Sequence, residues 1–225
     1  MSLVKTGQQV KMNNQPGLTY IALLRGVNVG GKNKISMPEL KAAFEERRFS
    51  NVITYINSGN IIFDSDLDET AARKCCEELM EASFGLKIAV CIIPAGELLD
   101  ALKNAPDWWN SGADSRHNAI FVIPPMTPEQ ICAEVGEAKP EYEQVAYHGR
   151  VIFWSAPLAT FSRTRWSKVT QSKAAYGHIT IRNANTTTKL AKLVKEMQAA
   201  SYFSHRPEAP HGSISPDSFT GSPIS

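Results

Sequence analysis

The chain alternates strand-like and helical segments in an order that leaves few possible folds. In the first half the apolar patterns predict two helices and four strands. The helices are Met37–Arg47 and Leu67–Ser83, and the strands are Leu18–Leu24, Val52–Ile56, Ile61–Asp64 and Lys87–Ile93. The two middle strands are joined by Asn57-Ser58-Gly59-Asn60, a composition typical of a tight hairpin turn. The order is β-α-β-β-α-β, the split βαβ or ferredoxin-like motif.

The same order then occurs a second time. Its strands are Asn118–Ile123, Glu143–Tyr147, Val151–Ser155 and His178–Arg182, with one helix that begins after Thr127 and another over Arg165–Ala175. A short helix over Gly96–Asn104 precedes this set, and an amphipathic helix over Thr187–Ala200 follows it. We therefore predict an α+β fold of two ferredoxin-like (βαββαβ) halves with an additional C-terminal helix. Because the match is one of element order, an ancient duplication is a hypothesis only.

The predicted boundaries divide the chain into five parts. These are a disordered lead-in (1–16), a first ferredoxin-like half (17–94), a connector with a short helix (95–116), a second half with the C-terminal helix (117–202) and a disordered tail (203–225). Two helix starts carry the pattern of a capping box with proline in the first turn. One is Ser36 with Glu39, and the other is Thr127 with Gln130. For the last helix, Asn185 or Thr186 is the expected cap.

Composition excludes several classes of protein. The formal charge of +2 argues against general coating of nucleic acid, and no apolar run reaches membrane-spanning length. The first 17 residues lack the features of a secretory signal, so we expect a cytoplasmic protein. Its four cysteines contain no C-x-x-C pair and its histidines have no metal-ligand spacing. We therefore expect reduced thiols and no metal site.

The loop Arg25–Lys34 is the strongest candidate for function. Its tandem glycines allow a close approach to backbone N–H groups, its cations add charge, and a helix begins just beyond it. The matching connection in the second half, Pro124–Met126, is short and apolar, so the fold does not require a long loop here. The alternative is a surface turn with solvated lysines. A P-loop spacing from Gly26 to Lys32 is coincidental, because Asn33 stands where Ser or Thr would bind Mg²⁺.

Three ordered blocks of the sequence resemble one known family. They are Ala22–Lys34, Thr54–Asn60 and Thr180–Leu190. Together they resemble domain-of-unknown-function family 1697, a mainly bacterial family, over about residues 18–198. The resemblance implies paired ferredoxin-like units, in agreement with the element order, and it implies no particular reaction.

The second and third blocks add further candidate ligands. The first two strands of a split βαβ unit are parallel, so the Asn57–Asn60 turn is expected beside the glycine loop, although turn chemistry alone also explains its composition. Arg182 and Lys189 could hold a phosphate or carboxylate. The predicted ligand-binding residues are Arg25, Asn28, Gly30, Gly31, Lys32, Asn33, Lys34, Asn57, Ser58, Asn60, Arg182, Asn183 and Lys189.

Two other segments favour structural roles. Ser162–Lys168 mixes cations with an aromatic residue and could contact nucleic acid, but a basic helix start is commonly a solvated face, which is the expectation here. Trp108 and Trp109 are expected to pack between the halves. Tyr20, Tyr55 and Phe63 could instead stack on bases if they lined an open sheet face.

The leading hypothesis is a protein that binds a phosphorylated or anionic small molecule, such as a nucleotide, through the glycine loop. One alternative is an enzyme that acts on such a ligand, which requires a carboxylate, histidine or cysteine within reach of the loop. Another is an RNA- or DNA-binding module. No catalytic motif is recognisable, and neither a cofactor nor the oligomeric state follows from the sequence.

Overall fold

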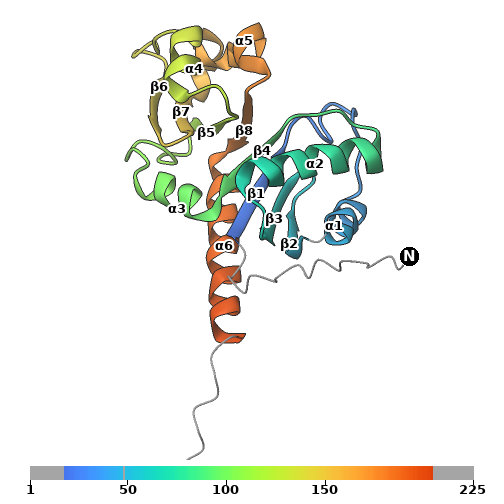
Figure 1. Ribbon diagram of the computed structural model, residues 1–225. Coiled ribbons are helices and arrows are strands. Elements are labelled where there is room, and N and C mark those ends of the chain that lie inside the picture. Colours follow the sequence, from blue (N-terminus) through green and yellow to red (C-terminus); the bar gives the residue numbers. More distant parts are fainter. Residues whose placement is uncertain (1–17, 48, 205–225) are drawn as a thin grey trace, which may run out of the picture.

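The computed structural model describes residues 18–47 and 49–204, which form two lobes (Figure 1). Each lobe contains a four-stranded antiparallel sheet. The first sheet has the order β2-β3-β1-β4 and the second has the order β6-β7-β5-β8. The strands are β1 (Leu18–Leu24), β2 (Ser50–Tyr55), β3 (Asn60–Ser65), β4 (Val90–Pro94), β5 (Ser115–Val122), β6 (Gln144–His148), β7 (Val151–Pro157) and β8 (Ile179–Asn183). Both sheets thus have ferredoxin-like strand order, which confirms the predicted fold class.

The outer face of each sheet is covered by the helices of its own lobe. In the first lobe, α1 (Met37–Glu46) and α2 (Glu69–Phe84) pack on alternate strand residues such as Tyr20 and Phe63. In the second lobe, the cover consists of shorter elements. These are α4 (Pro128–Val135), the 3₁₀ helices η1 (Leu158–Arg163) and η2 (Trp166–Gln171), and α5 (Lys173–Tyr176).

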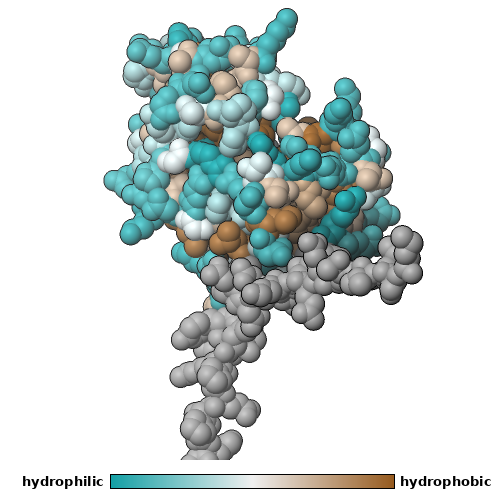
Figure 2. All heavy atoms as spheres, viewed as in Figure 1, coloured by the Kyte–Doolittle hydropathy of each residue, from teal (hydrophilic) through white to brown (hydrophobic). Residues whose placement is uncertain are grey.

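The inner faces of the two sheets share one core with α3 (Ala95–Lys103) and α6 (Ala184–Ser204). Ile21 of β1 and Phe121 of β5 both belong to this core. Trp109 lies in it too and donates its indole N–H to the carbonyl of Asn118 at 2.8 Å, which confirms the expected packing between the halves. In Figure 2, hydrophobic residues gather where the lobes meet. Neither sheet therefore presents an open face.

The structure corrects one predicted cap and two predicted helix starts. The side chain of Ser36 makes no capping hydrogen bond, so only the Thr127–Gln130 capping box forms. The helix predicted over Arg165–Ala175 is divided into η2 and α5, because Ser172 between them has extended backbone angles and its Oγ accepts from the Ala175 N–H to cap α5. The last helix begins earlier than predicted, at Ala184.

That earlier start changes the cap of the last helix. Asn183 takes the role expected of Asn185 or Thr186, because its Oδ1 accepts from the Thr186 N–H at 2.7 Å. The helix continues to Ser204, beyond the predicted boundary at residue 202. The predicted lead-in (1–16) and the rest of the predicted tail (205–225) lie outside the described residues.

A membrane-spanning helix is absent from the described part of the chain, where none is both long and apolar enough. Residues 18–47 and 49–204 also contain no group of three histidine, cysteine or acidic side chains placed to hold a metal ion.

Candidate functional site

The glycine loop between β1 and α1 forms a narrow hairpin. Val29 and Lys32 form an isolated β-bridge, in which the Lys32 N–H donates to the Val29 carbonyl at 3.1 Å. The turn between them needs positive φ at both central residues. Gly30 and Gly31 have φ of 58° and 76°, which explains why two glycines occur in tandem here.

Asn28 holds the base of this hairpin. Its Nδ2 donates to the carbonyls of Ile35 at 3.0 Å and Asn57 at 2.8 Å, and its Oδ1 accepts from the Ile35 N–H at 2.8 Å. Asn33 adds a bond from its Nδ2 to the Gly26 carbonyl at 3.0 Å. The contact between Asn28 and Asn57 confirms that the two loops lie side by side, as the parallel strands predict. Both side-chain amides are used within the protein.

Gly59 allows the hairpin turn to approach the glycine loop closely. Its carbonyl accepts from the Leu24 N–H at 2.8 Å, and its φ is 70°. A Cβ at this position would lie 2.4 Å from Cγ2 of Val27 and 2.7 Å from Cβ of Leu24. No residue with a side chain fits without movement of the backbone, so this glycine is needed for contact as well as for conformation.

A shallow hollow of about 520 Å³ lies where the two loops meet the start of α1. Its lining consists of Asn28, Gly31, Lys34, Ile35, Ser36, Met37 and Asn57. Within the described residues, the backbone N–H groups of Gly31 and Lys34 have no hydrogen-bond partner. The start of α1 adds the positive end of the helix dipole. The hollow therefore combines amide donors, a dipole and the Lys34 ammonium, which together favour an anion.

Arg25 lies away from this hollow. Its guanidinium carbon is 3.7 Å from the centre of the Tyr176 ring, so it makes a cation–π contact with α5 of the second lobe. The first residue of the predicted loop thus joins the two lobes.

Arg182 is a buried link between the lobes. Its Nε donates to Oδ1 of Asn60 at 2.5 Å, and its Nη2 donates to the carbonyls of Leu24 at 2.8 Å and Ser58 at 3.0 Å. Its Nη1 donates to Oγ1 of Thr180. Burial lowers the pKa of the guanidinium to about 10, so it remains cationic at neutral pH. The third sequence block therefore meets the first two, but its arginine is engaged inside the protein and not in the hollow.

The other predicted residues divide between structural roles and the surface. Asn60 donates to the Tyr55 carbonyl and to Oγ of Ser58, which places both polar side chains inside the turn. Asn183 caps α6. Gly30 and Lys32 are exposed at the hairpin, and Lys189 lies on α6; none of these three lines the hollow. The structure thus brings Asn28, Gly31, Lys34 and Asn57 together around one hollow.

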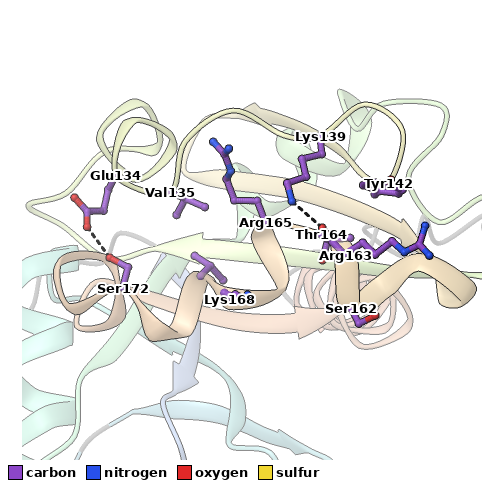
Figure 3. Close-up of a pocket in the computed structure, with 11 residues that line it drawn as sticks. Glu134, Val135, Lys139, Tyr142, Ser162, Arg163, Thr164, Arg165, Lys168 and Ser172 are labelled. Atoms are coloured by element: carbon purple, nitrogen blue, oxygen red, sulfur yellow. Dashed lines mark hydrogen bonds between the residues drawn. The ribbon is translucent and has the colours of Figure 1, made fainter.

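A larger hollow of about 620 Å³ lies in the second lobe (Figure 3). Three of its cations, Arg163, Arg165 and Lys168, belong to the basic stretch for which a solvated face was expected. The fourth, Lys139, comes from the loop after α4 and carried no local sequence signal. Only the tertiary fold brings it to the other three.

The thiols do not offer a nucleophile. All four cysteines are free, and Cys76 and Cys91 are buried. Burial raises the pKa of the Cys91 thiol to about 12 and that of Cys76 well above its usual value. Burial also raises the pKa of the half-buried Cys75 and Cys132. All four thiols are therefore kept protonated at neutral pH, and the thiolate is the reactive form.

Comparison with known proteins gives a matching family model and a similar solved structure. Residues 18–153 match a family model described as "Protein of unknown function (DUF1697)". A solved structure, that of the conserved bacterial protein SP0830 from Streptococcus pneumoniae, is similar with a TM-score of 0.72 and 30% sequence identity. The similarity covers 80% of this chain and 99% of that one. A search of curated proteins finds no match.

Proposed function

Since the chain belongs to the DUF1697 family, whose description gives no activity, we propose its function from the geometry. The protein binds a phosphorylated or otherwise anionic small molecule, such as a nucleotide, in the hollow between the glycine loop and the Asn57–Asn60 turn. The single observation that carries this proposal is the group of N–H donors without internal partners beside Lys34, at the start of α1.

The geometry supports ligand binding in this hollow because hydrogen bonds and close packing hold its walls in place. Asn28 ties the loop to Ile35 and Asn57, and Gly59 packs the turn against Val27. A ligand would therefore meet donors that need little reordering, which lowers the entropic cost of binding. The short connection Pro124–Met126 of the second lobe also supports a binding role for the glycine loop, because it shows that the fold does not require a longer loop.

Binding is better supported than catalysis at this place. An enzyme of the kind considered above needs an acid, a base or a nucleophile near the ligand. The residues that line the hollow, all within the described part of the chain, include no carboxylate, histidine or cysteine. Nucleic-acid binding through a sheet face receives no support either, because Tyr20 and Phe63 are buried beneath α1 and α2.

We also propose that the protein is located in the bacterial cytoplasm. This location is supported by the four free cysteines, which are typical of a reducing compartment, and by the similarity to a protein of Streptococcus pneumoniae.

Calorimetric titration with a panel of nucleotides and sugar phosphates tests the proposal. We expect one or more of these to bind and Lys34→Ala to weaken binding roughly tenfold, as loss of one charge-assisted bond does. Lys32→Ala is the matched control, because this lysine is close in sequence but does not line the hollow. The proposal fails if no member of the panel binds the wild-type protein, or if both variants weaken binding equally.

A further inference from the structure

The hollow of the second lobe differs from that of the first in its charge. It lies between the loop after α4 and the segment that contains η1 and η2, with Val135 and Val169 among its apolar lining (Figure 3). Four cations line it: Lys139, Arg163, Arg165 and Lys168. The one acidic residue in the lining is Glu134, whose Oε1 accepts from Oγ of Ser172 at 2.8 Å.

These four cations have no carboxylate within ion-pair distance in the part of the chain that the structure describes. Lys139 uses one of its three N–H donors on the Arg163 carbonyl, at 3.1 Å. The guanidinium of Arg163 lies 5.7 Å from the centre of the Tyr142 ring. Like charges gathered around one hollow repel one another, and an anion bound among them would relieve that repulsion.

Two features fix the backbone that carries these side chains. The first is Glu143, which is 3% exposed and whose carboxylate accepts four N–H bonds. The donors are the backbone N–H groups of Lys139 at 3.2 Å, Arg165 at 2.7 Å and Trp166 at 3.0 Å, and the Trp154 indole at 3.1 Å. One buried side chain thus ties both walls of the hollow together.

The second feature is Gly136, whose carbonyl accepts from the Trp166 indole N–H at 3.2 Å. A Cβ on this residue would lie 2.5 Å from Nη1 of Arg165, so the absence of a side chain leaves room for the guanidinium. The cations therefore stand on a framework that is ordered before any ligand arrives, which is the arrangement that gives affinity at low entropic cost.

We propose that this hollow is a separate binding site for a small ligand that carries two or more phosphate groups. Among the described residues, the side chains of these four cations use only one donor internally, the Lys139 bond to the Arg163 carbonyl, and the donors left over are more than the oxygens of one phosphate group can accept. Arginine is well suited to such a ligand because its planar guanidinium bonds phosphate oxygens in pairs. The volume falls in the range of small-molecule sites, and Val135, Val169 and Tyr142 offer non-polar surface to an attached group.

The test is calorimetric titration of the full chain with sodium triphosphate, ATP and adenosine, at about 50 mM and about 200 mM NaCl. We expect triphosphate and ATP to bind, adenosine not to bind, and affinity to fall as salt rises. Tighter binding of ATP than of triphosphate would identify a nucleotide as the source of the phosphate groups. Equal affinity would identify the free polyphosphate.

The decisive variant is Arg165→Met with Lys168→Met, which removes two charges and keeps the aliphatic length. We expect triphosphate affinity to fall roughly a hundredfold, about tenfold for each charge. The matched control is Lys192→Met with Lys195→Met on exposed positions of α6, and it should bind as the wild type does. If the double variant does not fold, Lys168→Met alone, at an exposed position, should lower affinity about tenfold.

The two proposed sites fail separately. Lys34→Ala should leave triphosphate binding unchanged. If Lys34→Ala loses triphosphate binding while Arg165→Met/Lys168→Met keeps it, this second site is overturned and the first remains. Wild-type protein that binds no triphosphate overturns it as well. So does a short single-stranded RNA that binds more tightly than triphosphate and displaces it, because the occupant would then be a nucleic acid.

Discussion

The two lobes have the same strand order but differ in the connection between the first strand and first helix. In the first lobe this connection is the hairpin around Gly30 and Gly31, held at its base by Asn28. In the second lobe it is Pro124–Met126 and then the capped start of α4. The second lobe shows that a short connection is enough to build the fold. The longer loop of the first lobe is therefore an addition, and additions on rigid scaffolds are where binding sites commonly occur.

Two arginines of the second lobe contact the first lobe and α3 in different environments. The second lobe inserts Arg182 among neutral acceptors at the end of β1 and in the β2–β3 turn. Its β6–β7 turn instead carries Arg150, which bonds the carboxylates of Glu69 and Glu97, both at 2.6 Å. The first contact is buried and the second is partly exposed. An interaction in the first environment is harder to replace with water, which gives the comparison a measurable consequence.

The largest effect is expected from Arg182→Met. This change leaves the Leu24 and Ser58 carbonyls and the Asn60 amide without their buried donor, at a cost of about 4 kcal/mol in the free energy of unfolding. Arg150→Met should cost about 1 kcal/mol, because its two carboxylates can hydrate. Urea denaturation of both variants measures the difference. Equal losses would contradict the distinction between the two contacts.

A second comparison uses the glycines of the two hairpin turns. Gly59→Ala should destabilise the protein by about 3 kcal/mol, since the new Cβ meets Val27 and Leu24 and the residue has positive φ. Gly149 also has positive φ, but a Cβ there meets only the Glu97 side chain, at 3.5 Å. Gly149→Ala should therefore cost about 1 kcal/mol. Thermal unfolding of the pair would refute the close-approach argument if the two shifts were alike.

A third test concerns the rigidity of the glycine loop. Asn28→Asp keeps the acceptor for the Ile35 N–H but loses both donated bonds, and should cost about 1–2 kcal/mol. Asn33→Asp loses one exposed bond to the Gly26 carbonyl and should cost about 0.5 kcal/mol. Hydrogen exchange at Ile35 should accelerate in the first variant alone. Unchanged exchange there would mean that Asn28 does not hold the loop.

The smallest effects at neutral pH concern the thiols. Burial raises the folded-state pKa of Cys76 and Cys91, so the folded protein holds these protons more tightly than the unfolded chain does. Their contribution to stability is therefore complete below the ordinary thiol pKa of about 8.5 and decreases as the pH rises from there toward the raised pKa of each folded-state thiol. Alkylation should be slower at these two cysteines than at the half-buried Cys132 of the second lobe.

Peptide mapping after timed alkylation measures the order of reaction. Faster modification of Cys91 than of Cys132 in the folded protein would show that the first sheet opens more readily than its burial indicates.

The sequence alone determined the order of the elements, the hairpin turn at Asn57–Asn60 and the capping box at Thr127. Each of these depends on hydrogen bonds or apolar periodicity within a few residues. The sequence also predicted that the glycine loop and the Asn57–Asn60 turn lie side by side, because the parallel first and second strands place the loops after them at the same end of the sheet. Four of the predicted ligand residues accordingly line the hollow of the first lobe.

Tertiary structure alone decided the roles of Arg182, Arg25 and Glu143. Arg182 and Arg25 contact the opposite lobe, and Glu143 joins two loops that are distant in sequence. Nothing in the residues around an arginine distinguishes one that binds a ligand from one buried among carbonyl groups. Only the docking of the two lobes brings those carbonyls to Arg182, and only the packing of the η1–η2 segment against the loop after α4 gathers four cations around one hollow.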